Sequence, residues 1–242
     1  EDIRGFYWLA RTENLPDKLA HYNTLPNDEK NQLTSWLMGI CYNTEVNDKI
    51  CAKNLQNSLN ENNGNATNFY TKYFNHAQEI YAQYFTIPTE GKRTDVDWTN
   101  AEPNVARIPF LDKNLTAPIK YFLHNIELEW KWENWQLLLN YVKSGNVPYI
   151  EFAAGETPHV NEFGGNQIVM DANQPLTEWD SQWTIRHEFG HVLGFPDCYV
   201  EFYDDSLKAI VNYQIDETNL MCSRKGNLQK IHFLEMQRNY FK

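Results

Sequence analysis

The stretch from His187 to Asp197 limits what this chain of 242 residues can fold into more than any other. His187 and His191 are four residues apart, so a helix places both imidazoles on one face and carries Glu188 beside them. A helix alone cannot bring a third side chain to the same point. Gly194 supplies the positive φ that ends a helix and turns the chain back, and Asp197 follows three residues later. The stretch therefore predicts a helix, a tight turn and a return segment around one metal ion.

Zinc is the ion that this set of side chains favours. Two imidazoles and a carboxylate are zinc ligands, and the glutamate next to the first histidine is placed to hold a water on the ion. A bare His-Glu-x-x-His also occurs by chance in ordinary amphipathic helices. The glycine, the aspartate and a downstream methionine, Met221, favour the zinc interpretation. We expect His187, His191 and Asp197 to be the ligands and Glu188 to be the general base.

At these positions the chain resembles a known clan of proteases. His187-Glu188-x-x-His191-x-x-Gly194-x-x-Asp197 is similar to the metzincin zinc signature in the variant that ends in aspartate, and residues 219–221, Asn-Leu-Met, are similar to its Met-turn.

Within that clan the closest likeness is to the snapalysins, which are small secreted bacterial neutral proteases. Phe195-Pro196-Asp197 matches their Leu-Pro-Asp-like run, and Tyr199 matches a tyrosine two residues after their aspartate. The likeness covers only Arg186 to Cys222. The N-terminal hundred or so residues have no counterpart in that family, and the 23 residues between Asp197 and Met221 resemble an insertion.

The resemblance implies a secreted zinc-dependent endopeptidase of the α+β class, a metalloprotease and hydrolase. Its fold would contain a twisted mixed sheet, an active-site helix, a Met-turn and a C-terminal helix. Zinc would leave a fourth position for water and lower the pKa of that water toward about 7. Glu188 would accept the proton of this water and return it to the leaving amine, with no covalent intermediate. Tyr199 would stabilise the oxyanion or orient the substrate, with simple packing beside the turn as the alternative.

Other carboxylates are alternatives for the third ligand. Glu201, Asp204 and Asp205 lie within reach of the turn in sequence, and aspzincin-like enzymes place their aspartate further beyond the histidines than Asp197 stands. Glu217, as a gluzincin-like ligand, is the least favoured. We prefer Asp197 because Gly194 stands where a short return requires it.

Composition excludes several classes of partner. The net charge of −11 argues against nucleic acid and anionic membranes, which both require clustered Lys and Arg. No apolar run of about twenty residues is present, so we expect no membrane span. The expected partner is a protein or peptide substrate, and we expect the protein to be a monomer.

The four cysteines indicate an oxidising compartment. Cys41 and Cys51 flank a polar loop, whereas Cys198 follows Asp197 and Cys222 follows Met221, and we expect these two pairs to form disulfides. Four buried thiols are the alternative, since connectivity cannot be deduced from sequence. Disulfides favour a secreted or extracytoplasmic protein. The chain opens without a charged and then apolar leader, which we interpret as a mature or trimmed form.

The N-terminal part of the chain has helical periodicity. Leu33, Trp36, Leu37 and Ile40 recur at helical spacing, as do Phe69 and Tyr73. The Pro-, Gly- and charge-containing run from Pro88 to Pro103 is typical of a boundary. We therefore expect a helical region at residues 1–100 and the zinc metalloprotease domain at residues 101–242.

The second part is predicted to alternate strands and helices. We expect strands at 119–124, 148–153 and 165–171 and helices at about 127–143 and 178–193, the last one starting with a capping box of Thr177 and Asp180. By the resemblance, the 165–171 strand would lie at the cleft edge and pair with an extended substrate, the alternative being that it only fills the sheet.

A second functional class remains open from the sequence. The chain could bind zinc as a latent or non-catalytic protein whose helical N-terminal region covers the cleft or binds a partner protein. Asp95 and Asp97 are the acidic candidates to block the zinc in that form.

Overall fold

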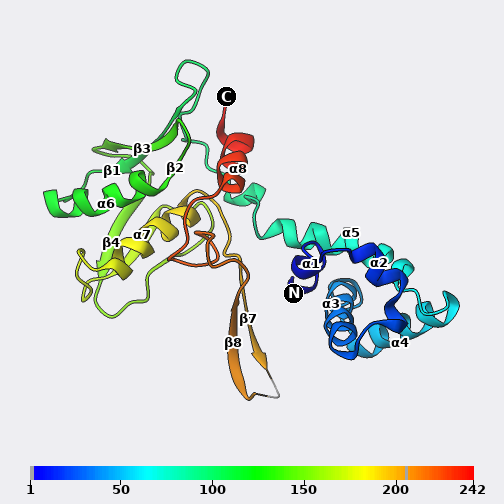
Figure 1. The fold of residues 1–242 in the computed structure, drawn as a ribbon. Coiled ribbons are helices and arrows are strands. Elements are labelled where there is room, and N and C mark those ends of the chain that lie inside the picture. The colour runs from blue at the N-terminus through cyan, green and yellow to red at the C-terminus, as the bar shows by residue number, and fades with distance from the viewer. Residues whose placement is uncertain (1–2, 205–206) are drawn as a thin grey trace. The chain divides into compact units, whose positions relative to one another are not determined.

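The computed structural model describes residues 3–204 and 207–242 and shows an α+β protein (Figure 1). Contacts divide the chain into two compact units. We call Glu1–Gln83 with Val200–Ile215 the helical unit, and Tyr84–Tyr199 with Asp216–Lys242 the mixed unit. Residues 84–100 therefore belong to the mixed unit, although they precede the expected boundary. The domain boundary at residue 101 stays a prediction.

The helical unit confirms the periodicity of the N-terminal sequence. Leu33, Leu37 and Ile40 on one helix and Phe69 and Tyr73 on another are buried in one core. The helices are α1 (Arg4–Leu9), α2 (Leu15–Ala20), α3 (Asn27–Glu45), α4 (Asp48–Glu61) and α5 (Thr67–Gln83), with a 3₁₀ turn η1 (Tyr22–Thr24). The strands β7 (Tyr199–Asp204) and β8 (Ala209–Gln214) pair with each other as a two-stranded sheet.

The mixed unit contains two three-stranded sheets. In the order β1-β3-β2, β1 is parallel to β3 and β2 is antiparallel to it; in the order β4-β6-β5, β4 is parallel to β6 and β5 antiparallel. The elements are η2 (Thr89–Gly91), β1 (Val105–Leu111), α6 (Ala117–Glu129), β2 (Lys131–Trp132), β3 (Trp135–Val142), β4 (Tyr149–Ala153), β5 (His159–Val160), β6 (Gln167–Asp171), α7 (Trp179–Val192) and α8 (Lys230–Tyr240).

Two predicted elements are wrong, and they exchange type. Residues 119–124, predicted as a strand, lie in α6, whose first turn contains Pro118. Proline is well tolerated at that position because the first-turn N–H has no partner inside the helix. The predicted helix at 127–143 is instead the end of α6 followed by β2 and β3. In β3 the side chains of Trp135, Leu137 and Leu139 are buried and alternate with less buried ones, so period 2 prevails over the helix preference of leucine.

The strand predictions at 148–153 and 165–171 are confirmed as β4 and β6, but the edge position is wrong. β6 is the middle strand of its sheet, and β5 lies at the edge. With only two residues, His159 and Val160, β5 is too short to produce an alternating pattern in the sequence.

The helix predicted at 178–193 is confirmed as α7, and Ile185, Phe189 and Val192 are fully buried on its core face. The predicted capping box is wrong, because the residue that caps α7 is Glu178 and its side chain makes no capping hydrogen bond.

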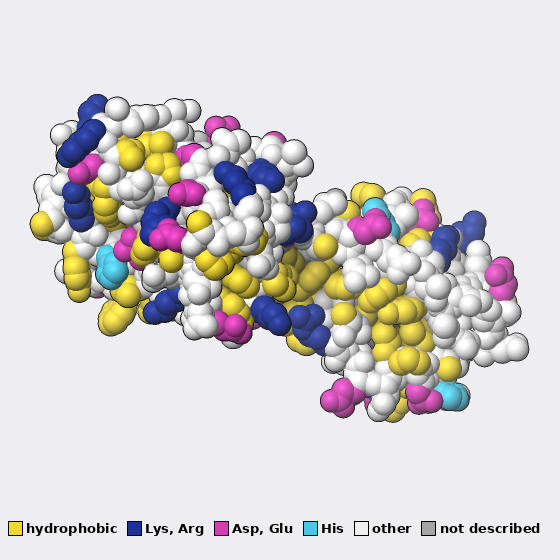
Figure 2. Space-filling view, turned by 90° about the horizontal axis from the view of Figure 1, so that it is seen from above, with side chains coloured by type: hydrophobic (Ala, Val, Ile, Leu, Met, Phe, Trp, Pro, Cys, Tyr) yellow, Lys and Arg dark blue, Asp and Glu magenta, His cyan; other side chains and the backbone are white. Residues whose placement is uncertain are grey.

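The surface carries charges of both signs. On the face that Figure 2 shows, basic and acidic side chains are interspersed, and apolar side chains gather on the helical unit. Among the described residues, no helix combines the length and the hydropathy that crossing a membrane requires.

Candidate metal centre

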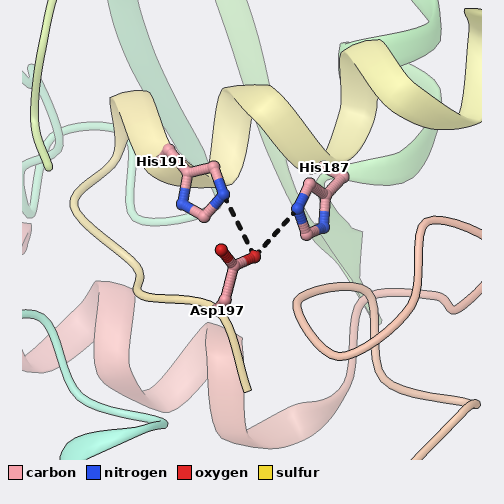
Figure 3. Close-up of side chains that lie close together, drawn as sticks. All are labelled: His187, His191 and Asp197. Atoms are coloured by element: carbon pink, nitrogen blue, oxygen red, sulfur yellow. Dashed lines mark ion pairs between the residues drawn. The ribbon is translucent and has the colours of Figure 1, made fainter. Parts of the chain in front are cut away.

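Helix α7 presents two imidazoles side by side. His187 and His191 are one turn apart, their ring centroids lie 4.9 Å apart, and both residues are buried (Figure 3). Glu188 is also buried, with 2% of its surface exposed. A buried carboxyl next to two imidazoles is costly unless the site uses its charge.

A glycine turn brings the third side chain back to the helix. Gly194 has φ of +92°, and its N–H donates to the carbonyl of His191 at 2.9 Å. A Cβ at this position would lie 2.5 Å from the carbonyl oxygen of Gly91, so a side chain is excluded by space as well as by φ. After this turn, Oδ1 of Asp197 lies 3.1 Å from Nε2 of His187 and 3.3 Å from Nε2 of His191 (Figure 3).

Two backbone carbonyls set the protonation of the imidazoles. Nδ1 of His187 lies 2.8 Å from the carbonyl oxygen of Leu220, and Nδ1 of His191 lies 2.8 Å from that of Phe195. A carbonyl can only accept, so each Nδ1 carries a proton, and Nε2 is the ring atom that faces Asp197 and that binds a cation when it carries no proton. Such carbonyl partners are the usual outer support of metal-binding histidines.

The three side chains fit a metal ion. Among the described residues, His187, His191 and Asp197 form the one group of ligand atoms close enough to share an ion. With both Nδ1 protons donated elsewhere, the two Nε2 atoms and Oδ1 of Asp197 face one another, and apart from these rings no group donates to this buried oxygen. The distances of 3.1 and 3.3 Å are close to the edge of about 3.3 Å in a tetrahedron with bonds of about 2.0–2.1 Å. A cation between these atoms would satisfy all three.

The electrostatics agree with this geometry. Burial acts to raise the pKa of Asp197, but the imidazoles of His187 and His191 outweigh it and hold the pKa well below its usual range. Burial acts to lower the pKa of His191, yet Asp197 leaves it raised. Protons therefore compete with a metal for these atoms as the pH falls.

Glu188 shows the opposite behaviour. Burial raises its pKa, although His191, His187 and Arg224 act in the other direction. A carboxyl with a raised pKa can both accept and return a proton near neutral pH.

Residues 219–221 contact α7 at His187 and Gly190. Leu220 provides the carbonyl that accepts from His187, and the side chain of Met221 packs so closely on α7 that any Cβ at Gly190 would overlap its sulfur. The backbone N–H of Cys198 donates to the carbonyl of Met221 at 3.1 Å.

The cysteines pair as expected, Cys41 with Cys51 and Cys198 with Cys222. The second disulfide joins the residue after Asp197 to the residue after Met221.

The other candidate carboxylates do not join the metal group. Glu201, Asp204 and Glu217 are absent from it, and Oδ1 of Asp204 accepts the backbone N–H of Leu207. Asp205 lies outside the described residues.

The proposed zinc-blocking carboxylates are also absent from the metal group. Asp95 instead forms an ion pair with Arg93, while the backbone of Asp97 bridges to Arg107. Tyr199 begins β7 and is half-buried, and its part in a reaction stays a prediction.

Sequence reasoning missed the groups that hold the ligands. The carbonyls of Leu220 and Phe195 leave no sequence signal because every residue has one. His232 was also missed: its Nδ1 accepts the N–H of Gln229, and its Nε2 therefore donates to Oδ1 of Asn219 at 3.0 Å. That same oxygen accepts the N–H of Met221.

A comparison with known protein families, curated proteins and solved structures finds no match to this chain.

Proposed function

We propose that the protein is a secreted zinc-dependent endopeptidase of the metzincin type. One observation carries this proposal: two imidazoles, each with Nδ1 bonded to a backbone carbonyl, and a carboxylate bring three ligand atoms together, beside a buried glutamate. Structural zinc sites commonly have four protein ligands, whereas catalytic ones keep a position open. Three ligands with an adjacent base therefore favour catalysis over a structural role.

Each residue has a defined part in the proposed hydrolysis. His187, His191 and Asp197 would hold zinc, which when bound supplies Lewis acidity toward the scissile carbonyl and acidity to a water. Glu188 accepts the proton of the attacking water. It then donates that proton to the amine nitrogen as the peptide bond breaks, so charge does not accumulate on the leaving group. The raised pKa of Glu188 suits both steps.

A hollow in the mixed unit is the proposed place for substrate. It has a volume of about 330 Å³ and follows α7 from Ser181 to Thr184, one turn before Glu188. Met170 at the end of β6 and Arg224 after the Met221 turn also line it. Among the described strands β5 pairs with β6 alone, and an extended peptide would pair with the other edge of β5.

The remaining parts of the proposal rest on sequence and on the disulfides. Tyr199 orients the substrate or the oxyanion, by its match to the snapalysin tyrosine. The protein works as a monomer. It works outside the cytoplasm, and the two disulfides support this location.

Replacing Glu188 tests the proposal most directly. Glu188→Gln keeps the side-chain volume but cannot accept a proton, so we expect casein hydrolysis to fall by about 10²- to 10⁴-fold. Zinc content, measured by elemental analysis, should stay at one ion per chain. The matched control is Glu162→Gln, which changes an exposed glutamate of the same unit and should leave both quantities unchanged.

Two results would contradict parts of the proposal. Undiminished hydrolysis by Glu188→Gln would remove this residue from the mechanism. Zinc bound to a wild-type protein that hydrolyses no peptide would favour the latent or non-catalytic zinc-binding alternative.

A further inference from the structure

Arg93 is a buried cation that the proposed mechanism does not use. Only 8% of its surface is exposed. Because arginine is almost never fully buried without partners, the groups that pair with Arg93 matter. Its Nε and Nη2 donate to the two carboxylate oxygens of Asp95 at 2.8 and 2.6 Å. This two-point pairing fixes the plane of the guanidinium and leaves its other N–H groups free to reach elsewhere.

Nη1 joins the carboxyl end of α7, which carries His191, to the segment at Gly164. Nη1 donates to the carbonyl of Val192, the residue after His191, at 3.5 Å and to the carbonyl of Gly164 at 3.1 Å. Gly164 in turn donates its N–H to the carbonyl of His191 at 2.8 Å. A cation at the carboxyl end of α7 is also favourable because the helix dipole is negative there.

The backbone just before Arg93 packs closely against the turn at Gly194. A Cβ on Gly164 or Gly194 would be too close to the carbonyl oxygen of Gly91. The hydroxyl of Tyr240 accepts the N–H of Arg93 at 3.2 Å and donates to the carbonyl of Leu193 at 2.7 Å. The segment from Gly91 to Arg93 thus contacts the turn between His191 and Asp197 through backbone and side chain.

On the basis of the proposed zinc site, we propose that Arg93 is a positioning residue for the metal centre. Through Val192 and Gly164 it holds the end of α7 and the glycine turn in the one arrangement that brings Asp197 to both imidazoles. Arg93 touches neither metal nor substrate, and it acts through backbone carbonyls. Its place in the sequence, before the expected start of the catalytic domain, makes residues 91–95 part of the site.

The test compares metal binding by folded variants. Arg93→Met combined with Asp95→Asn removes the ion pair without leaving a half-buried carboxylate unpaired. Zinc affinity is measured by competition with a chromophoric chelator, and ligand geometry by the visible absorption of the Co²⁺ form. We expect the zinc dissociation constant to rise by about 10- to 100-fold, the range for residues that orient ligands, and the Co²⁺ absorption to weaken.

Two further variants separate positioning from loss of charge or fold. Arg107→Met removes an arginine on β1, in the same unit, that is paired with Glu102, and it should leave affinity and spectrum unchanged. Arg93→Lys keeps the positive charge but cannot bond Asp95, Gly164 and Val192 together. We therefore expect its zinc affinity to lie between those of the double variant and the wild type. If the double variant does not fold by circular dichroism, Arg93→Lys alone decides, by its Co²⁺ spectrum.

Wild-type affinity and an unaltered Co²⁺ spectrum in the folded Arg93 variants would overturn this inference and leave the proposed function standing. A wild-type protein that binds neither zinc nor cobalt would instead overturn the proposed function.

Discussion

At the scale of single residues, the position of two protons decides what the centre can bind. The carbonyls of Leu220 and Phe195 keep the Nδ1 protons of His187 and His191, so Nε2 is the atom of each ring that takes up a further proton or a cation. Asp197 adds a negative charge whose pKa is held well below its ordinary range, against the effect of burial, by the two imidazoles. A metal ion between them would satisfy all three atoms.

The residue-scale prediction concerns Asp197, the proposed third ligand. Asp197→Ala should weaken zinc binding by more than about 100-fold, beyond the range for outer-shell changes, because two imidazoles alone chelate poorly. Asp204→Ala should leave the affinity nearly unchanged, since Asp204 is outside the ligand group. Chelator competition on both variants gives the two dissociation constants. Equal losses would favour an aspzincin-like centre in place of the proposed one.

At the scale of elements, helix α8 and the Met221 turn support the candidate metal centre on the Nδ1 side of His187. His232 in the first turn of α8 accepts from the N–H of Gln229 and donates to Asn219, whose side-chain oxygen also holds the N–H of Met221. One imidazole thus caps a helix and orders the turn that supplies the carbonyl partner of His187. The arrangement works only while His232 is neutral.

This requirement predicts a loss of stability in acid. Burial lowers the pKa of His232 to about 4, whereas the unfolded chain takes up the proton near pH 6.5. Between these values the unfolded state binds more protons, so stability falls as the pH drops from 6.5 to about 4 and this residue adds no further loss below. The contribution is on the order of 3 kcal/mol at 1.36 kcal/mol per pH unit.

Urea unfolding of the metal-free protein at several pH values measures this effect. His232→Gln, which can accept and donate like the neutral imidazole but does not titrate, should show a weaker pH dependence in this window. Parallel profiles for the wild type and the variant would refute the assignment of the acid sensitivity to His232.

A second element-scale prediction concerns the Cys198–Cys222 disulfide. It closes a loop with a sequence separation of 24, worth about 3 kcal/mol in the chain-entropy model. Because it ties the residue after Asp197 to the residue after Met221, we expect its main effect on metal retention. Cys198→Ala with Cys222→Ala should increase zinc loss by a larger factor than the corresponding Cys41 and Cys51 double variant does.

Melting temperatures of the metal-free forms provide the comparison for this pair of variants. A similar zinc dissociation constant in both double variants would show that the Cys198–Cys222 bond serves general stability instead.

At the scale of the whole molecule, the chain changes unit three times. It leaves the helical unit at Gln83, returns to it at Val200 after the third ligand, and re-enters the mixed unit at Asp216. The mixed unit also depends on residues before the expected boundary. Trp98 is 1% exposed, and its ring lies 5.2 Å from that of Trp135 and 5.3 Å from that of Phe241.

This organisation predicts different results for two truncations. A protein starting at Tyr84 should fold and bind zinc, because it keeps Arg93 and Trp98. A protein starting at Pro103 should not, since removal of a buried tryptophan alone costs about 3–5 kcal/mol. Circular dichroism and zinc content distinguish the two. Stable, zinc-loaded protein from the shorter chain would contradict the assignment of residues 84–102 to the mixed unit.

The truncation at Tyr84 also addresses latency. A large gain in peptide hydrolysis by this form over the full chain would favour a helical region that covers the cleft. Equal activity would favour a role for the helical unit apart from inhibition.

What could be predicted locally was predicted well. The helix at 178–193, the strands at 148–153 and 165–171 and the helical N-terminal region follow from periodicities within one element, and the structure confirms them. The exchange of type between 119–124 and 127–143 shows the limit of such patterns. Leu137 and Leu139 by themselves favour a helix, and pairing with β1 selects the strand.

The sequence by itself determined the three side chains that converge, because His187, His191, Gly194 and Asp197 lie within eleven residues and their geometry is set by one helix and one turn. Only the tertiary structure decided what holds them: Leu220 behind His187, Arg93 across the end of α7, and β5 at the sheet edge. The reason is physical. Backbone carbonyls and buried ion pairs act between segments far apart in the chain, where no spacing rule applies, and their partners are chosen by packing.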